Sequence, residues 1–118
     1  VSEVLKFANP LTLCVAVEPA TSPILSEGRA GDHGIVGIGA DFVPPLLDWV
    51  LIDEIVTVST QQAIDMSSRL AREEGLLVGF SSGANVYVAL KRAERLGKNN
   101  TVVTILPDTG ELYSHLTA

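Results

Sequence analysis

The stretch Leu76-Leu-Val-Gly-Phe-Ser-Ser-Gly-Ala-Asn85 decides the fold class and points to a ligand site. Its short apolar run predicts a buried strand over residues 76–80, and a helical pattern follows at once. In an open α/β sheet, this order places Ser81 and Ser82 between the carboxyl end of a strand and the amino end of a helix. Ligands bind at such junctions, because free backbone N–H groups and the positive end of the helix dipole point into a crevice there.

Three other apolar runs predict buried strands. They are short, rich in Val, Ile and Leu, and not strictly alternating, and they cover residues 11–17, 54–58 and 101–106. Runs of this kind are typical of parallel strands that are covered on both faces.

Two helices are predicted between these strands. In the first, Ser59 and Gln62 form a capping box, and Gly75 fits the position just past a helix end. The second follows the two serines, carries an apolar face and closes at Gly97. Strands that alternate with helices in this way predict an α/β fold, a parallel sheet with helices on both faces built from right-handed βαβ units.

The connection over residues 19–52 has no clear periodicity and carries five glycines and four prolines. Loops of this length in compact domains are usually functional or disordered. Burial of its apolar residues would anchor it; these are Ile35, Val36, Ile38, Phe42, Val43, Leu46, Leu47 and Trp49. Its segment Gly37-Ile-Gly-Ala40 pairs two glycines that let the backbone approach a ligand. The third glycine of a dinucleotide fingerprint is missing and no strand directly precedes the segment, which disfavours NAD.

Composition excludes several function classes. The 118 residues carry a formal net charge of −6 with a pI near 4.7, which argues against nucleic acid as a partner. No apolar stretch approaches the length of a membrane span, so a cytoplasmic protein is the default expectation. The single Cys14 lies in an apolar run, cannot form an internal disulfide and is expected to be a small core residue.

Several readings of the polar residues compete. Ser81 and Ser82 fit helix capping, which serine performs routinely. Ser81 also fits the letters of a Gly-x-Ser-x-Gly hydrolase motif, with Asp108 and His115 as acid and base, although that motif needs a specific context. The turn of Asp108 and Thr109 follows the last predicted strand and either closes a turn or faces the same crevice. His33 has no partner at metal-ligand spacing, so no metal site is predicted.

Several motifs occur together in a fixed order that resembles one enzyme family. They are Val17-Glu-Pro19, Ser22-Pro23, Gly37-Ile-Gly-Ala40, Phe42-Val-Pro44, Glu74-Gly-Leu-Leu-Val-Gly79, Ser81-Ser-Gly-Ala84 and Pro107-Asp-Thr-Gly-Glu111 followed by Tyr113. This order resembles the carboxyl-terminal part of the cysteine synthase (O-acetylserine sulfhydrylase) family. The related cystathionine β-synthases share its pyridoxal 5'-phosphate fold, fold type II, like the β subunit of tryptophan synthase.

The resemblance implies a transferase of cysteine biosynthesis, which replaces the acetate of O-acetylserine with sulfide. It implies that Ser81 binds the pyridine nitrogen of the cofactor and that Asp108 and Thr109 support that side of the ring. The loop Gly37, Ile38, Gly39 and Ala40 would line the substrate side. A neutral hydroxyl does not stabilise a protonated ring nitrogen as a carboxylate does, which suits β-elimination. A homodimer is implied, as is binding of the carboxyl-terminal peptide of serine acetyltransferase.

The sequence also departs from the family. The Schiff-base lysine and the glycine-rich phosphate loop of the family precede the point that matches Val1, and Leu112 stands where the family usually has Arg. Lys6, Lys91 and Lys98 lie in contexts unlike the family's lysine motif. We therefore expect residues 1–118 to be a carboxyl-terminal portion without a catalytic residue of its own, and inactive alone. A cystathionine β-synthase-like activity and a non-catalytic partner-binding α/β module remain the alternatives.

Overall fold

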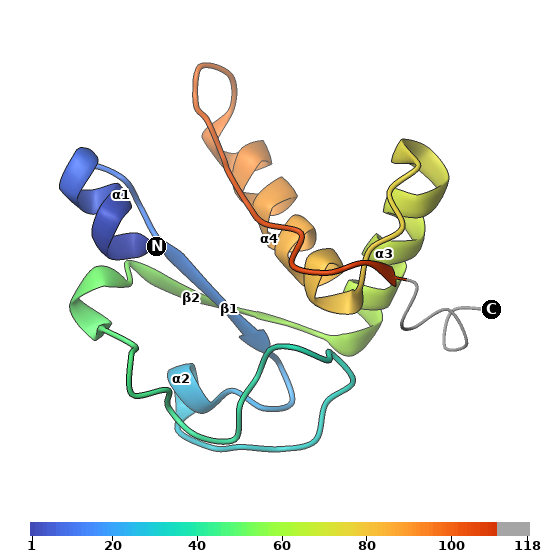
Figure 1. The fold of residues 1–118 in the computed structure, drawn as a ribbon, viewed down its shortest axis with the longest axis horizontal. Coiled ribbons are helices and arrows are strands. Elements are labelled where there is room, and N and C mark those ends of the chain that lie inside the picture. The colour runs from blue at the N-terminus through green and yellow to red at the C-terminus, as the bar shows by residue number, and fades with distance from the viewer. Residues whose placement is uncertain (111–118) are drawn as a thin grey trace.

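The computed structural model describes residues 1–110 of the chain. Its elements in order are α1 (Ser2–Ala8), β1 (Val15–Pro19), α2 (Ile24–Glu27), the 3₁₀ turn η1 (Trp49–Leu51), β2 (Glu54–Val58), α3 (Thr60–Glu74) and α4 (Phe80–Leu96). β1 and β2 pair in parallel, with Val15 opposite Glu54 and Pro19 opposite Val58. Figure 1 shows α3 leading away from the carboxyl end of β2, α4 running back alongside the two strands, and the long connection between β1 and β2 looping out below them. The α/β class is confirmed.

The predicted helix signals are confirmed in detail. The Ser59 hydroxyl accepts from the Gln62 N–H at 3.1 Å, and the Gln62 side chain accepts from the Ser59 N–H at 2.9 Å. Gly75 ends α3 with a left-handed φ of 68°, a conformation that costs glycine little. Gly97 ends α4 as predicted.

Two of the four predicted strands are wrong. Residues 101–106 form no strand, and residues 76–80 contribute only an isolated antiparallel bridge between Val78 and Thr109. A strand exists only where a neighbour pairs with its backbone groups along its length; within residues 1–110 the run at 101–106 forms no such ladder, and the run at 76–80 pairs only at this one bridge. Side chains that the prediction buried are exposed as a result: Val103 keeps 83% of its surface. The first strand begins later than predicted, at Val15, and runs to Pro19.

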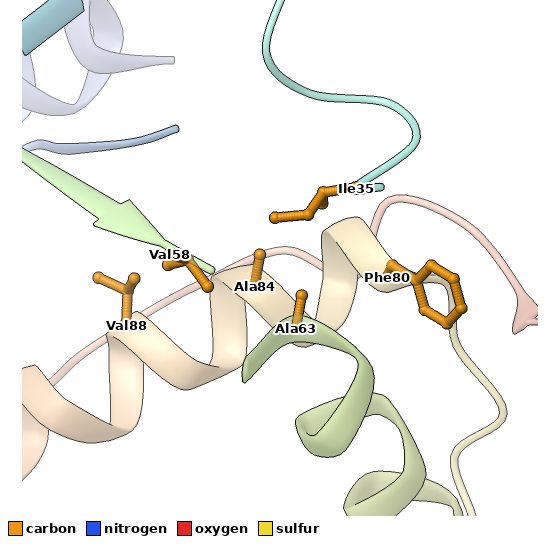
Figure 2. Packing of buried hydrophobic residues seen from close by; sticks show 6 residues of the cluster. All are labelled: Ile35, Val58, Ala63, Phe80, Ala84 and Val88. Carbon is orange, nitrogen blue, oxygen red and sulfur yellow. The ribbon is translucent and has the colours of Figure 1, made fainter. Parts of the chain in front are cut away.

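The buried core joins the long loop, β2, α3 and α4. It consists of Ile35, Val58, Ala63, Phe80, Ala84 and Val88, and Figure 2 shows these side chains gathered around the start of α4. Ile35 therefore anchors the loop, as predicted. Phe42, Leu46 and Trp49 do not: they are exposed, Leu46 at 98%. Val36 and Val43, also expected to be buried, are exposed as well, so burial anchors the loop at Ile35 and not at these positions.

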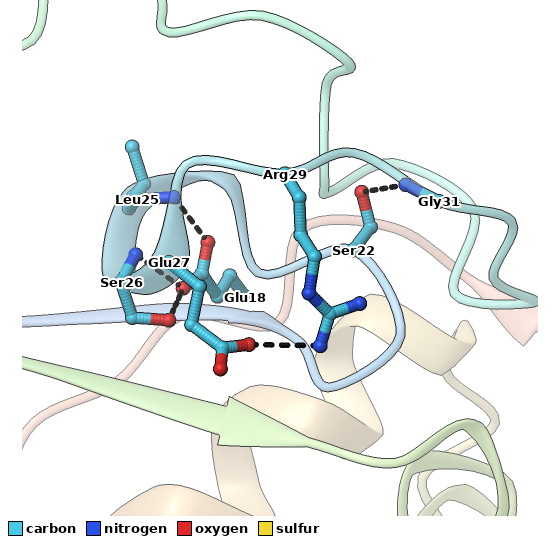
Figure 3. A network of polar contacts seen from close by, with 7 residues as sticks. All are labelled: Glu18, Ser22, Leu25, Ser26, Glu27, Arg29 and Gly31. Carbon is cyan, nitrogen blue, oxygen red and sulfur yellow. Dashed lines mark hydrogen bonds and ion pairs between the residues drawn. The ribbon is translucent and has the colours of Figure 1, made fainter.

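The chain that follows β1 is held by a buried carboxylate (Figure 3). Glu18 accepts from the backbone N–H groups of Leu25 and Ser26 at 2.8 and 2.9 Å, and from the Ser26 hydroxyl at 2.6 Å. The Ser22 hydroxyl accepts from the Gly31 N–H at 3.2 Å. The bonds to Glu18 satisfy donors at the start of α2 that the short helix cannot pair itself. Together with the bond to Ser22, they fold residues 18–31 into a compact turn.

Among residues 1–110, no helix combines the length and apolar character that crossing a membrane requires.

Candidate functional site

The site is built around the amino end of α4, which is fixed by a close crossing with α3. Gly83 lies so near α3 that a β-carbon there would stand 2.2 Å from the Ala63 carbonyl oxygen and 2.4 Å from Ser67 Oγ. The Ser67 hydroxyl in turn donates to the carbonyl of Gly79, the residue that precedes α4, at 3.0 Å. A glycine in a helix interior lowers helix stability, and here the close crossing explains it.

The two serines belong to the first turn of α4 and do not cap it. The N-cap is Gly79, and no side chain caps the helix. The capping interpretation of Ser81 and Ser82 is therefore wrong. Both are buried, Ser81 at 3% exposure and Ser82 at 0%. Within residues 1–110 the Ser82 hydroxyl has no hydrogen-bond partner, and no hydrogen bond of the Ser81 hydroxyl is found there either. Buried hydroxyls normally have partners, so this helix start is suited to a ligand.

The segment Gly37–Ala40, called the glycine loop below, lies beside the first turn of α4. A β-carbon on Gly37 would lie 3.6 Å from Ser81 Oγ, at ordinary contact distance, so the loop backbone lies beside the serine with space for about a methyl group between them. Gly37 and Gly39 both have positive φ, 100° and 68°, which side chains rarely adopt. Gly37 and Ser81 are 44 residues apart in the sequence, and the sequence predicts that they share a site. In the fold they are neighbours.

The turn that carries Asp108 and Thr109 lies against the residues just before α4. Thr109 forms the bridge with Val78, the Asp108 carbonyl accepts from the Gly79 N–H at 3.4 Å, and the Gly110 N–H donates to the Leu77 carbonyl at 3.0 Å. In Figure 1 this last described segment returns beside α4 to its start. The turn thus approaches the site through its backbone.

Three segments therefore converge on the first turn of α4. The arrangement offers neutral hydroxyls, glycine backbone and the positive end of a 17-residue helix. Such a set binds a polar aromatic or anionic ligand by hydrogen bonds. Among the described residues, no group of three or more His, Cys, Asp or Glu side chains is placed to hold a metal ion.

The hydrolase reading lacks a base among residues 1–110. Of the two histidines of the chain, His115 lies outside the described residues, as do Glu111, Leu112 and Tyr113. His33 has both ring nitrogens engaged, one with the Ile35 N–H at 3.1 Å and the other with the Gly39 carbonyl at 3.0 Å. It therefore has no nitrogen free to take a proton from Ser81.

Two lysines of the described residues, Lys6 and Lys91, are placed away from the start of α4. Lys6 pairs with Asp53 at 2.6 Å. Lys91 lies over the ring of Tyr87, 5.7 Å from its centroid, and is ten residues from Ser81, about 15 Å along the helix at the usual rise.

Comparison with known proteins identifies the class. The profile of the family described as "Pyridoxal-phosphate dependent enzyme" matches residues 1–108. The chain belongs to this family of pyridoxal-phosphate dependent enzymes, and the cofactor predicted from the sequence is the cofactor of the family.

Individual relatives show which members of the family the chain is similar to. The chain is 48% identical over 113 residues to cysteine synthase of Staphylococcus aureus (strain N315), covering 96% of this chain and 36% of that protein. It is 41% identical to the solved O-acetyl serine sulfhydrylase isoform 3 from Entamoeba histolytica, with a TM-score of 0.94, covering 98% of this chain and 35% of that one. It is also 41% identical to the O-acetylserine dependent cystathionine beta-synthase from Helicobacter pylori, with a TM-score of 0.87 and coverage of 97% and 37%. The chain thus spans about a third of the length of these relatives.

Sequence reasoning missed two features of the site. One is the crossing of α3 and α4 at Gly83, which a glycine in an otherwise good helical pattern signals. The other is the contact of the glycine loop with the end of β1: a β-carbon on Gly39 would stand 2.5 Å from Cγ of Pro19. No local sequence pattern predicts that contact.

Proposed function

We propose that residues 1–118 are the carboxyl-terminal portion of a cysteine synthase. In the reaction, the bond between the β-carbon of O-acetylserine and its acetate oxygen breaks, a bond from the same carbon to sulfur forms, and acetate leaves as sulfide adds. The observation that carries the proposal is the convergence of Ser81, the Gly37–Ala40 loop and the Asp108–Thr109 turn in a chain 48% identical to a cysteine synthase.

The residues present fit pyridoxal phosphate. Ser81 offers a buried neutral hydroxyl with no hydrogen bond found within residues 1–110, which matches the single nitrogen of a pyridine ring. A hydroxyl at this nitrogen either donates to it or accepts from it, without fixing a positive charge there. When bound, the cofactor supplies an electron sink for the bonds that break at the substrate carbons.

The other two segments support this arrangement. Gly37 lies beside Ser81 and carries no side chain, which leaves room there for a substrate amino acid close to the backbone. Asp108 and Thr109 hold the strand-like residues Val78 and Gly79 in front of α4. In this proposal the lysine that binds the cofactor covalently and the phosphate loop come from outside residues 1–118.

The similarity to the cystathionine beta-synthase from Helicobacter pylori supports a second candidate function, in which the thiol of homocysteine replaces sulfide. In both reactions the described residues would contact the same amino-acid substrate, O-acetylserine. The two candidate functions therefore differ only in the sulfur compound that adds to it. We further propose a homodimer that binds the carboxyl-terminal peptide of serine acetyltransferase, as the resemblance implies, and a cytoplasmic location, which is the default expectation from the sequence.

The test uses the complete polypeptide that carries these residues, whose intact mass is measured first. The purified protein is assayed with O-acetylserine and either sulfide or homocysteine, with an enzyme-free control. Cysteine formation supports the proposal, and cystathionine as the main product favours the second candidate. Cofactor binding without either product would contradict both and favour the non-catalytic partner-binding module. The separate 118-residue chain, with added cofactor, is expected to form no cysteine.

A further inference from the structure

His33 contacts the glycine loop at two points. Its Nδ1 accepts from the Ile35 N–H at 3.1 Å, and its Nε2 lies 3.0 Å from the Gly39 carbonyl oxygen. An amide N–H only donates and a carbonyl only accepts, so the two partners assign the proton to Nε2 and make the ring neutral. The imidazole therefore bridges the backbone on both sides of Gly37.

One side of this bridge is firmly anchored. Ile35 is fully buried in the core, and the Gly34 N–H donates to the Thr60 hydroxyl at the start of α3 at 3.0 Å. The ring thus projects from a part of the chain that packing already fixes.

The other side of the bridge holds the tip of the loop. A β-carbon on Gly39 would lie 2.7 Å from His33 Nε2 and 2.5 Å from Pro19 Cγ. The Gly39 backbone is therefore confined between the imidazole and the end of β1. Gly37, two residues earlier, lies beside Ser81.

We propose that His33 is a positioning residue that sets the distance between the Gly37–Ala40 segment and Ser81, and thereby the affinity for the amino-acid substrate. The inference rests on the proposed function, because it takes this segment to line the substrate side. The decisive contact is the bond from Nε2 to Gly39, since the Ile35 end is held by burial as well. His33 acts through the loop and takes no proton from the substrate.

Two variants separate the two bonds. In His33→Asn, the amide oxygen takes the place of Nδ1, which keeps the bond from Ile35 and loses the bond to Gly39. In His33→Gln, the longer side chain places an amide N–H near the position of Nε2, which keeps the bond to Gly39 and loses the other. Asn100→Ala is the matched control, because it also removes side-chain bonds to backbone carbonyls, those of Leu96 and Lys98, in the turn after α4 and away from the glycine loop.

In the complete enzyme, His33→Asn is expected to raise KM for O-acetylserine by about fivefold, the factor that one neutral hydrogen bond provides, with a smaller change in kcat. His33→Gln and Asn100→Ala are expected to keep KM within about twofold of the wild-type value. If His33 only stabilised the fold, the Asn and Gln variants would change KM equally. Equal KM values in these two variants, or a wild-type KM in His33→Asn, would overturn the inference.

Hydrogen exchange of the loop amides provides a measurement that does not depend on activity. The amides of residues 37–40 are expected to exchange faster in His33→Asn than in His33→Gln. If the wild-type enzyme makes no cysteine, the proposed function fails, whereas this comparison still decides whether His33 holds the loop. Equal exchange in the two variants would contradict the role of His33 even in an active enzyme.

Discussion

Gly37 lies beside Ser81: a β-carbon on Gly37 would stand 3.6 Å from the serine hydroxyl and 3.7 Å from its β-carbon. This proximity links the long loop after β1 to the first turn of α4. It brings the glycine segment and the serine motif into one site, and the following substitutions test that site.

Gly37→Ala is expected to weaken substrate binding more than it weakens the fold. The added methyl group would enter the space beside Ser81 at ordinary contact distance, and the φ of 100° adds conformational strain of about 1–2 kcal/mol. Gly28→Ala is the control, since Gly28 has a φ of 74° and nothing within 4 Å of the added carbon. We expect similar losses of thermal stability in the two variants and a raised KM for O-acetylserine only in Gly37→Ala. A raised KM in both would contradict the placement of Gly37 at the substrate.

Ser81→Ala is expected to retain bound cofactor and to slow the reaction in the complete enzyme. Leaving a buried ring nitrogen without a partner costs about 1–3 kcal/mol, and cofactor absorbance with single-turnover rates measures both effects. Ser81→Asp is expected to retain the cofactor with a changed absorption spectrum, because a carboxylate favours the protonated ring. Wild-type rates and spectra in Ser81→Asp would exclude contact between residue 81 and the ring.

Gly83→Ala is expected to destabilise the fold, although alanine normally favours a helix over glycine by about 1 kcal/mol. The new methyl group would stand 2.2 Å from the Ala63 carbonyl, so α3 and α4 must separate, at a cost of about 1–3 kcal/mol or more. Gly75→Ala adds its methyl group to open space, so its cost is limited to the strain of a left-handed φ of 68°, about 1–2 kcal/mol. Thermal unfolding of the complete enzyme compares the two. A gain of stability in Gly83→Ala would show that the helices do not cross so closely.

Asp53→Asn is expected to lower stability at neutral pH and to have no effect in acid. Hydrogen bonds from the Lys6 ammonium and the Cys14 N–H hold the pKa of the Asp53 carboxyl below its ordinary value of 3.8. A lowered pKa means that the carboxylate stabilises the fold above that value, and that this contribution disappears as the pH falls through the folded pKa. Wild type and variant should therefore differ in unfolding midpoint at pH 7 and converge once the pH has fallen below the lowered pKa of the folded Asp53 carboxyl. Asp32→Asn, whose carboxylate makes no hydrogen bond or ion pair within residues 1–110, is the control. A difference that persists unchanged in acid would exclude the charge as its cause.

Local sequence signals predicted the helices and one strand well. The capping box at Ser59 and the glycine after Glu74 act within one turn of chain, so α3 matches its signals at both ends. β2 matches the predicted run of residues 54–58 because it pairs with β1 inside the same segment. The ordered motifs also identified the family, since together they are far more specific than any one glycine pattern.

The wrongly predicted strands at 76–80 and 101–106 show that local sequence signals do not determine strand pairing. Apolar runs report a tendency to be buried, whereas a strand also needs a partner for its backbone, and such a partner is a property of the whole fold. The capping interpretation of Ser81 was wrong for a related reason. Serine favours the N-cap, but the bond from Ser67 to the Gly79 carbonyl and the crossing at Gly83 place the helix start two residues earlier.

The sequence by itself determined the α/β class and the limits of α3, and it predicted the residues that we propose for the site. Those features depend on propensity, periodicity and motifs, which act over a few residues. Only the tertiary structure decided that Gly37 lies beside Ser81, that the Asp108 turn lies against Gly79, and that His33 holds Gly39 against Pro19. Each of these contacts joins segments through packing or a hydrogen bond whose partner no local pattern specifies, so it forms only when the core around Ile35 brings the segments together.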